Sequence, residues 1–347
     1  MDRTSQERIP SLDGLRAIAI ALVVVGHVAA AGIPLGVPPR IVQVLDLGNL
    51  GVRIFFVLSG FLITGILYES SALGRFYLRR ALRIFPAYYV YILAIVIFSS
   101  LRPAEHAADG LLAAATYTSN YARCSWDLSH SWSLSVEEQF YLGYPLVLML
   151  ASRRRTQWLF AGLLVVFPLV RLCYWRLGID YTYRFEAVGD ALVAGCMLRG
   201  AQAWLRANAT WQRLCHSSLP AVLAAACIPL HLVGSHPSLV PTLAYLVVVL
   251  PVLHVMIAFC IDAFVQRPQS RIGRVLNSSV LTKVGVASYS IYLWQQPFLN
   301  PARNGSWSSL ALHLGLVAVA ATASYLLIER PVQALRRAIS SYRESAP

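Results

Sequence analysis

Two ionisable residues lie in the first apolar stretch of the chain, "LDGLRAIAIALVVVGHV", residues 12–28. Arg16 is at its front edge, and His27 is in its middle. At about 100° and 1.5 Å per residue, this spacing places both side chains on one helix face, roughly 16 Å apart along the axis. The pattern predicts a cation at one membrane surface and a titratable base near the midplane. A histidine that only hydrogen-bonds a neighbouring helix would give the same pattern.

Three arginines precede a later apolar run in "FYLRRALRIFPAYYVY", residues 76–91. They are Arg79, Arg80 and Arg83, and the last two share a helix face because they are three residues apart. Paired guanidinium groups can bind phosphate through two parallel hydrogen bonds. Basic residues that only anchor a span on the cytoplasmic side explain the spacing equally well.

Two adjacent carboxylates lead into an apolar segment in "SHSWSLSVEEQFYL", residues 129–142. These are Glu137 and Glu138, on the side that we expect to face outward. Ser135 precedes Glu138 by three residues, which fits a capping box at the start of a helix. Trp132 fits either this outer site or an aromatic belt at the membrane surface.

The segment "GVASYSIYLWQQPFLN", residues 285–300, is too polar for a helix that faces lipid. Ser288, Tyr292 and Gln295 share a face, and we expect them in the bundle interior, as helix contacts or as the lining of a channel. Glu329, in "LIERP", falls at the inner end of the last span, level with Arg16. It could equally form a salt bridge at a helix end.

Three charged residues open the predicted sixth span: Arg184, Glu186 and Asp190. The two carboxylates are four residues apart and could form a proton relay. Pairing with arginines inside the bundle is the favoured interpretation.

The composition indicates an all-α polytopic transmembrane bundle. Of 347 residues, 57% are hydrophobic and 13% are charged, and the mean hydropathy is +0.58, whereas soluble domains carry about 25% charged residues. The apolar segments lack the two-residue alternation of a transmembrane barrel. Ser59 and Gly60 indicate a possible break or re-entrant turn in the second span. We expect ten spans, at 15–33, 51–69, 84–101, 139–151, 157–175, 185–200, 219–234, 239–264, 284–300 and 308–328.

The basic residues orient this bundle. With both termini in the cytoplasm, 21 of the 29 Lys and Arg residues fall on the inner side, as the positive-inside rule requires. This asymmetry explains the formal charge of +13 without a nucleic-acid partner. We expect a single domain over 1–347. The six cysteines and eight histidines lack the spacing of a disulfide framework or a metal site.

Together these segments resemble the acyltransferase 3 family of integral-membrane O-acyltransferases. The similarity extends from "SLDGLRAIAIALVVVGH" through "FFVLSGFLITGILY", "FYLRRALRIFPAYY", "SWSLSVEEQFYL" and "SYSIYLWQQP" to "IERP". It implies a multi-pass protein of the bacterial cytoplasmic membrane that moves acyl groups, often acetyl from acetyl-CoA, onto sugar hydroxyls. Lipopolysaccharide, peptidoglycan, exopolysaccharide and macrolide acceptors occur in the family. Some members carry a C-terminal hydrolase-like domain, which we do not expect here.

The resemblance also assigns roles. Arg16 and His27 match the essential pair of the family, and Arg80 and Arg83 match its donor-binding RxxR motif. Asp13 beside Arg16, and Glu329, match acidic positions that are considered important in other members.

Two positions depart from the family pattern. Many members have His where this chain has Gln295, and many have Asp where it has Arg53. Gln295 can form hydrogen bonds but cannot serve as a base.

We therefore expect acyl-CoA to be a co-substrate, with no bound cofactor, that is held by Arg80 and Arg83 on the cytoplasmic side. His27 would be the general base for a hydroxyl acceptor that enters from the outer side, near 102–138. A covalent acyl-enzyme, entry of the acceptor from the cytoplasm, and the oligomeric state remain open. The rival function is a transporter or exporter, which the lack of a detectable inverted repeat disfavours.

Overall fold

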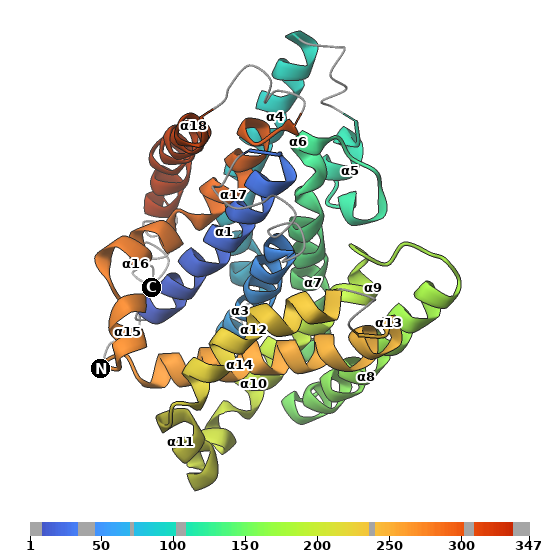
Figure 1. Ribbon diagram of the computed structural model, residues 1–347, viewed down its shortest axis with the longest axis vertical. Coiled ribbons are helices and arrows are strands. Elements are labelled where there is room, and N and C mark those ends of the chain that lie inside the picture. Colours follow the sequence, from blue (N-terminus) through green and yellow to red (C-terminus); the bar gives the residue numbers. More distant parts are fainter. Residues whose placement is uncertain are drawn as a thin grey trace, which may run out of the picture.

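The computed structural model describes residues 9–33, 46–69, 73–101, 109–235, 240–301 and 309–335, and in these ranges the chain is helical with no strand (Figure 1). The longer helices are α1 (Pro10–Ala30), α3 (Leu47–Glu69), α4 (Leu73–Leu101), α7 (Ser131–Leu150), α8 (Arg153–Arg176), α10 (Asp190–Ala207), α12 (Leu219–Ser235), α14 (Leu250–Gln266), α17 (Ser288–Phe298) and α18 (Leu310–Ser324). The shorter elements are α5 (Leu111–Ala115), η2 (Ser119–Tyr121), α6 (Trp126–Ser129), α9 (Phe185–Val188), α11 (Ala209–His216), α13 (Thr242–Ala244), η3 (Tyr245–Val249), α15 (Arg271–Leu276), α16 (Ser279–Val286) and η5 (Tyr325–Glu329).

Six of the described helices are long and apolar enough to cross a membrane, or seven if the bent pair α11–α12 forms one span. The chain is thus a multi-pass helical membrane protein, which confirms the predicted fold class. The remaining predicted spans, 139–151, 185–200 and 284–300, fall on the shorter or more polar helices α7, α10 and α17. The count of ten spans, the cytoplasmic termini and the single domain stay predictions.

Close helix crossings organise the centre of the molecule. A side chain at Gly60 of α3 would lie 1.9 Å from the Leu192 carbonyl oxygen, and one at Gly195 of α10 would lie 2.0 Å from that of Val57. Small residues allow such backbone contact between membrane helices. The helix α3 is continuous through Ser59 and Gly60, so the predicted break is wrong. Gly60 serves a helix contact instead.

This crossing makes a testable prediction. Gly195→Leu should destabilise the protein by more than about 3 kcal/mol, because backbone rather than a flexible side chain fills the space. Gly162→Leu is the matched control, since nothing lies within 4 Å of the added Cβ at that helical position. The midpoint of thermal unfolding in detergent measures the difference. Equal midpoints for the two variants would show that the crossing is loosely packed.

The first turn of α1 packs against α15 and α16. A Cβ at Gly285 would lie 1.8 Å from the Asp13 carbonyl oxygen, and one at Gly14 would lie 2.2 Å from that of Leu276. Figure 1 shows α16 and α17 beside α1, and α12 and α14 side by side. These contacts fix the position of the helix that carries Arg16 and His27.

A buried charged network joins four helices. Arg171 of α8 pairs with Asp190 of α10 at 2.8 Å, and His254 of α14 lies 3.2 Å from the same carboxylate oxygen. Nε2 of this imidazole lies 3.1 Å from Nη1 of Arg53 on α3. Asp190 therefore pairs with an arginine inside the bundle, as favoured. Glu186 is partly exposed, where it pairs with Arg184 at 3.9 Å and accepts hydrogen bonds from Tyr121 and Tyr174, at 2.7 and 2.8 Å.

Candidate active site

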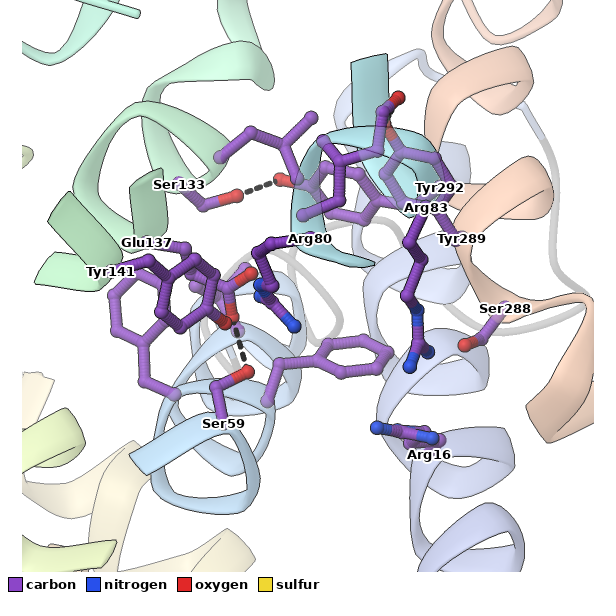
Figure 2. A pocket seen from close by; sticks show the side chains of 15 residues that line it. Arg16, Ser59, Arg80, Arg83, Ser133, Glu137, Tyr141, Ser288, Tyr289 and Tyr292 are labelled. Carbon is purple, nitrogen blue, oxygen red and sulfur yellow. Dashed lines mark hydrogen bonds between the residues drawn. The ribbon is translucent and has the colours of Figure 1, made fainter. Parts of the chain in front are cut away.

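Three predicted arginines line one cavity of about 90 Å³, which we call the arginine cavity. Figure 2 shows Arg16 from α1 and Arg80 and Arg83 from α4 directed into it. Among the described lining residues, Glu137 carries the single carboxylate. The cavity is therefore electropositive. Its other lining residues are Val52, Phe55, Phe56, Ser59, Ile84, Ser133, Leu134, Tyr141, Ser288, Tyr289 and Tyr292.

Neighbouring side chains hold two of the arginines in place. The guanidinium of Arg80 lies over the Tyr141 ring, 3.5 Å from its centroid, where the negative face of the ring attracts the cation. Arg16 pairs with Asp13 one turn earlier at 3.3 Å, which confirms that these two residues are adjacent. Ordered guanidinium groups lose less conformational entropy when they bind an anion.

Glu137 points into the same cavity from α7 and accepts a hydrogen bond from Ser59 of α3 at 2.6 Å (Figure 2). The sequence predicted that Glu137 and Ser288 lie on the acceptor side or line a channel. Both line the cavity that contains the three arginines, and Glu137 reaches it because α7 begins at Ser131 and its second turn packs against α3 and α4.

A second cavity, of about 310 Å³, surrounds His27, and we call it the histidine cavity. Its volume is at the lower limit of typical ligand pockets, about 300 Å³. The predicted Trp132 lines it, as do residues of the segment between α5 and α7. Of the predicted entrance at 102–138, residues 102–108 lie outside the described ranges. The other lining residues are Gly26, Ala30, Asp46, Leu47, Gly48, Asn49, Val52, Trp126, Ser129, His130, Tyr183, Tyr292 and Gln296.

The imidazole of His27 is oriented by Gln295, one of the two residues that depart from the family pattern. Its Nδ1 lies 3.1 Å from Oε1 of the buried Gln295. With the amide oxygen in this orientation, Nδ1 carries the proton and Nε2 keeps its lone pair. A Trp126 ring edge packs against the imidazole at 6.1 Å between centroids. Gln295 can thus hold a histidine base without itself being one.

The two cavities share a wall. Tyr292 and Val52 line both of them. The Tyr292 hydroxyl donates to the His130 carbonyl at 2.8 Å and accepts from Ser133 at 2.5 Å, and Figure 2 shows the second of these bonds. A group that moves between the arginines and His27 has to pass this wall.

Six predicted residues line neither cavity. Asp13 and Gln295 act on lining residues, since Asp13 pairs with Arg16 and Gln295 bonds to His27. The other four lie elsewhere. Arg79 lies on another side of α4, and Glu329 accepts a hydrogen bond from Ser290. Ser135 bonds to the Ser119 hydroxyl at 2.8 Å, and one oxygen of Glu138 is buried without a partner among the described residues. The predicted capping box is therefore wrong. The helix starts at Ser131, four residues earlier, so that Ser135 and Glu138 lie inside it.

Sequence reasoning missed several site residues. His130 lies two positions before Trp132 in the segment 129–142. Its imidazole, a group that often serves in active sites, was the signal that could have identified it. Tyr141 and Ser59 follow from contacts between α3, α4 and α7, which have no local signal. Trp126 lies in a four-residue helix that periodicity cannot reveal.

Comparison with known proteins fits this geometry. A family model described as an acyltransferase domain, that of the acyltransferase 3 family, matches residues 9–330. The chain belongs to this family. No solved structure matches it.

Three curated relatives are O-acetyltransferases by name. Peptidoglycan O-acetyltransferase OatA of Listeria monocytogenes is 26% identical over 95% of this chain and 57% of its own length. Putative peptidoglycan O-acetyltransferase YrhL of Bacillus subtilis is 29% identical, over 94% and 55%. O-acetyltransferase OatA of Staphylococcus aureus is 27% identical, over 95% and 58%. The chain thus spans somewhat more than half the length of these relatives.

Proposed function

We propose that the protein is a membrane O-acyltransferase that moves an acyl group, in the first instance acetyl, from acyl-CoA to a hydroxyl of a sugar-containing acceptor. The observation that carries this proposal is the pair of adjoining cavities, one lined by three arginines and the other by His27. Family membership and the printed names of the relatives support the reaction class and a glycan acceptor.

The charge of the arginine cavity supports acyl-CoA as the donor. Coenzyme A carries phosphates, and guanidinium groups bind phosphate through short charge-assisted hydrogen bonds. At about 90 Å³, the cavity is too small for the whole donor. The thioester end would therefore enter, and the phosphates would stay at the mouth near the exposed Arg83. Asp13 and Glu137 would balance the charge of Arg16 and Arg80 when the donor is absent.

His27 is the proposed general base. Its Nε2 takes the proton of the acceptor hydroxyl while the hydroxyl oxygen attacks the thioester carbonyl carbon. The C–O bond forms, the C–S bond breaks, and the thiolate of CoA takes the proton back from the imidazolium. Gln295 keeps the proton on Nδ1 throughout. A covalent acyl-enzyme in between would use the same base for its second step.

The acceptor would lie in the histidine cavity, on the side opposite the arginines. A small hydroxylated molecule such as a macrolide is the alternative acceptor, and the same cavity would have to admit it. The transporter hypothesis lacks a supporting observation of this kind, whereas the three arginines of the arginine cavity suit an anionic donor.

Donor binding tests the proposal. Arg83→Ala should weaken acetyl-CoA binding by tenfold or more, because a charge-assisted contact contributes about 1.5–3 kcal/mol. Arg213→Ala is the control, an exposed arginine of α11 whose contacts lie within its own helix. Isothermal calorimetry on the detergent-purified protein gives both dissociation constants. If the wild-type protein does not bind acetyl-CoA, or if both variants bind it equally, the assignment of the donor is wrong.

A further inference from the structure

The wall of the histidine cavity contains buried polar atoms without partners. His130 is 2% exposed, and neither of its ring nitrogens makes a hydrogen bond among the described residues. The backbone of Leu293 lies close to this ring. Gln296 is 1% exposed, and its Oε1 is also unpartnered there. Because buried polar groups are almost always satisfied, these atoms are free to bind a ligand with both donors and acceptors.

Gln296 is nevertheless held in place. Its Nε2 donates to the Ser129 hydroxyl at 3.1 Å, and its backbone carbonyl accepts from the indole of Trp126 at 3.1 Å. The free Oε1 is therefore presented by a side chain that is already ordered. A preorganised acceptor costs little entropy when a hydroxyl group binds to it.

Aromatic rings form the other part of this wall. Trp132 and Tyr183 are 4.6 Å apart between ring centroids and tilted by 34°, and Phe56 supports the Trp132 ring edge-on at 5.9 Å. Trp126 faces them from α6 as a lining residue. Flat, rigid rings of this kind bury the C–H face of a pyranose, while polar groups beside them take up its hydroxyls.

The charge of the cavity differs from that of its neighbour. Among its described lining residues there is no Lys or Arg, and Asp46 has the single carboxylate. Asn49 donates to both oxygens of Asp46, at 3.0 and 2.9 Å. An anionic ring would therefore be repelled by Asp46, whereas an uncharged ring could donate hydroxyl hydrogen bonds to it.

We infer that the histidine cavity is a subsite for an uncharged saccharide ring, stacked on Trp132 and Tyr183 and hydrogen-bonded by His130 and Gln296. The inference rests on the proposed function, because it specifies the acceptor side of that reaction. His130 and Gln296 are its specificity-determining residues. The hydroxyl to be acylated then faces Nε2 of His27 from within the same cavity.

Calorimetry without acyl-CoA tests the subsite separately from catalysis. The probe is chitotetraose, an uncharged saccharide, and the comparison ligand is tetragalacturonate, which is anionic and of the same length. The wild-type protein should bind chitotetraose at least tenfold more tightly than tetragalacturonate. His130→Phe, which keeps an aromatic ring of somewhat larger size and removes both nitrogens, and Trp132→Ala should each weaken chitotetraose binding tenfold or more.

Controls keep the outcomes distinct. Trp158→Ala changes an exposed ring on α8 and should leave saccharide binding unchanged. Normal acetyl-CoA binding by His130→Phe and Trp132→Ala would show that both variants are folded. Acetyl-CoA turnover without chitotetraose binding, or equal binding of the two saccharides, would overturn the subsite and leave the proposed function standing. Chitotetraose binding without any acetyl-CoA interaction would support the subsite and overturn the proposed function.

Discussion

Replacing His27 by alanine should leave acetyl-CoA binding unchanged and lower acyl turnover by at least about 100-fold. The binding result follows because His27 lines the histidine cavity and not the arginine cavity. The loss of turnover follows because a positioned general base contributes about 10²- to 10⁴-fold. Release of free CoA from acetyl-CoA, followed with a thiol reagent on the purified protein, measures the rate.

His216→Ala is the matched control for this variant. His216 is an exposed imidazole at the end of α11 that contacts only the Gln212 carbonyl in the described structure, at 2.9 Å. The His216→Ala protein should release CoA from acetyl-CoA at the wild-type rate. A His27→Ala protein with wild-type turnover would remove His27 from the chemistry, and one that no longer binds acetyl-CoA would make it part of the donor site.

Replacing Asp190 by asparagine should destabilise the protein by about 3–5 kcal/mol. The substitution keeps the shape of the side chain but leaves the buried Arg171 guanidinium without its counter-charge. The backbone carbonyls of Ala187 and Leu246 still accept from Arg171, at 2.7 and 3.1 Å, but they cannot neutralise it. The nearby His254 and Arg53 would then face an unpaired cation.

Thermal unfolding in detergent, with Asp180→Asn as the control, tests this prediction. Asp180 is exposed, and among the described hydrogen bonds its carboxylate accepts only from the backbone and hydroxyl of Thr182, at 3.0 and 2.6 Å. Its substitution should shift the midpoint little, since surface changes of this kind cost at most about 0.5 kcal/mol. Equal midpoints for the two variants would mean that the network does not stabilise the bundle.

Helix periodicity was sufficient to predict the position of a site residue where that position depends on the geometry of one helix alone. The spacing of Arg16 and His27 predicted a shared face of α1, and the structure places one in each of two adjoining cavities. The spacing of Arg80 and Arg83 likewise predicted a shared helix face, and both residues line the arginine cavity. These predictions hold because α1 and α4 are continuous helices of 21 and 29 residues.

The remaining site residues depend on contacts between helices, which periodicity cannot predict. Glu137 meets Ser59 and the arginines because α7 starts four residues before the predicted cap. His130 faces the histidine cavity because it lies between the short helix α6 and α7. The sequence also marked Gly60 as a helix break, but only the structure shows α10 packed against it.

The proposed reaction requires transfer of an acyl group from the arginine cavity, through the shared wall, to the histidine cavity. Proteoliposomes test this directly, with acetyl-labelled acetyl-CoA added outside and chitotetraose either enclosed or added outside. We expect O-acetylated chitotetraose inside the vesicles with the wild-type protein, and none with His27→Ala. Transfer through the shared wall would be contradicted if labelled saccharide forms only when donor and acceptor are on the same side. It would also be contradicted if no labelled saccharide forms in either arrangement.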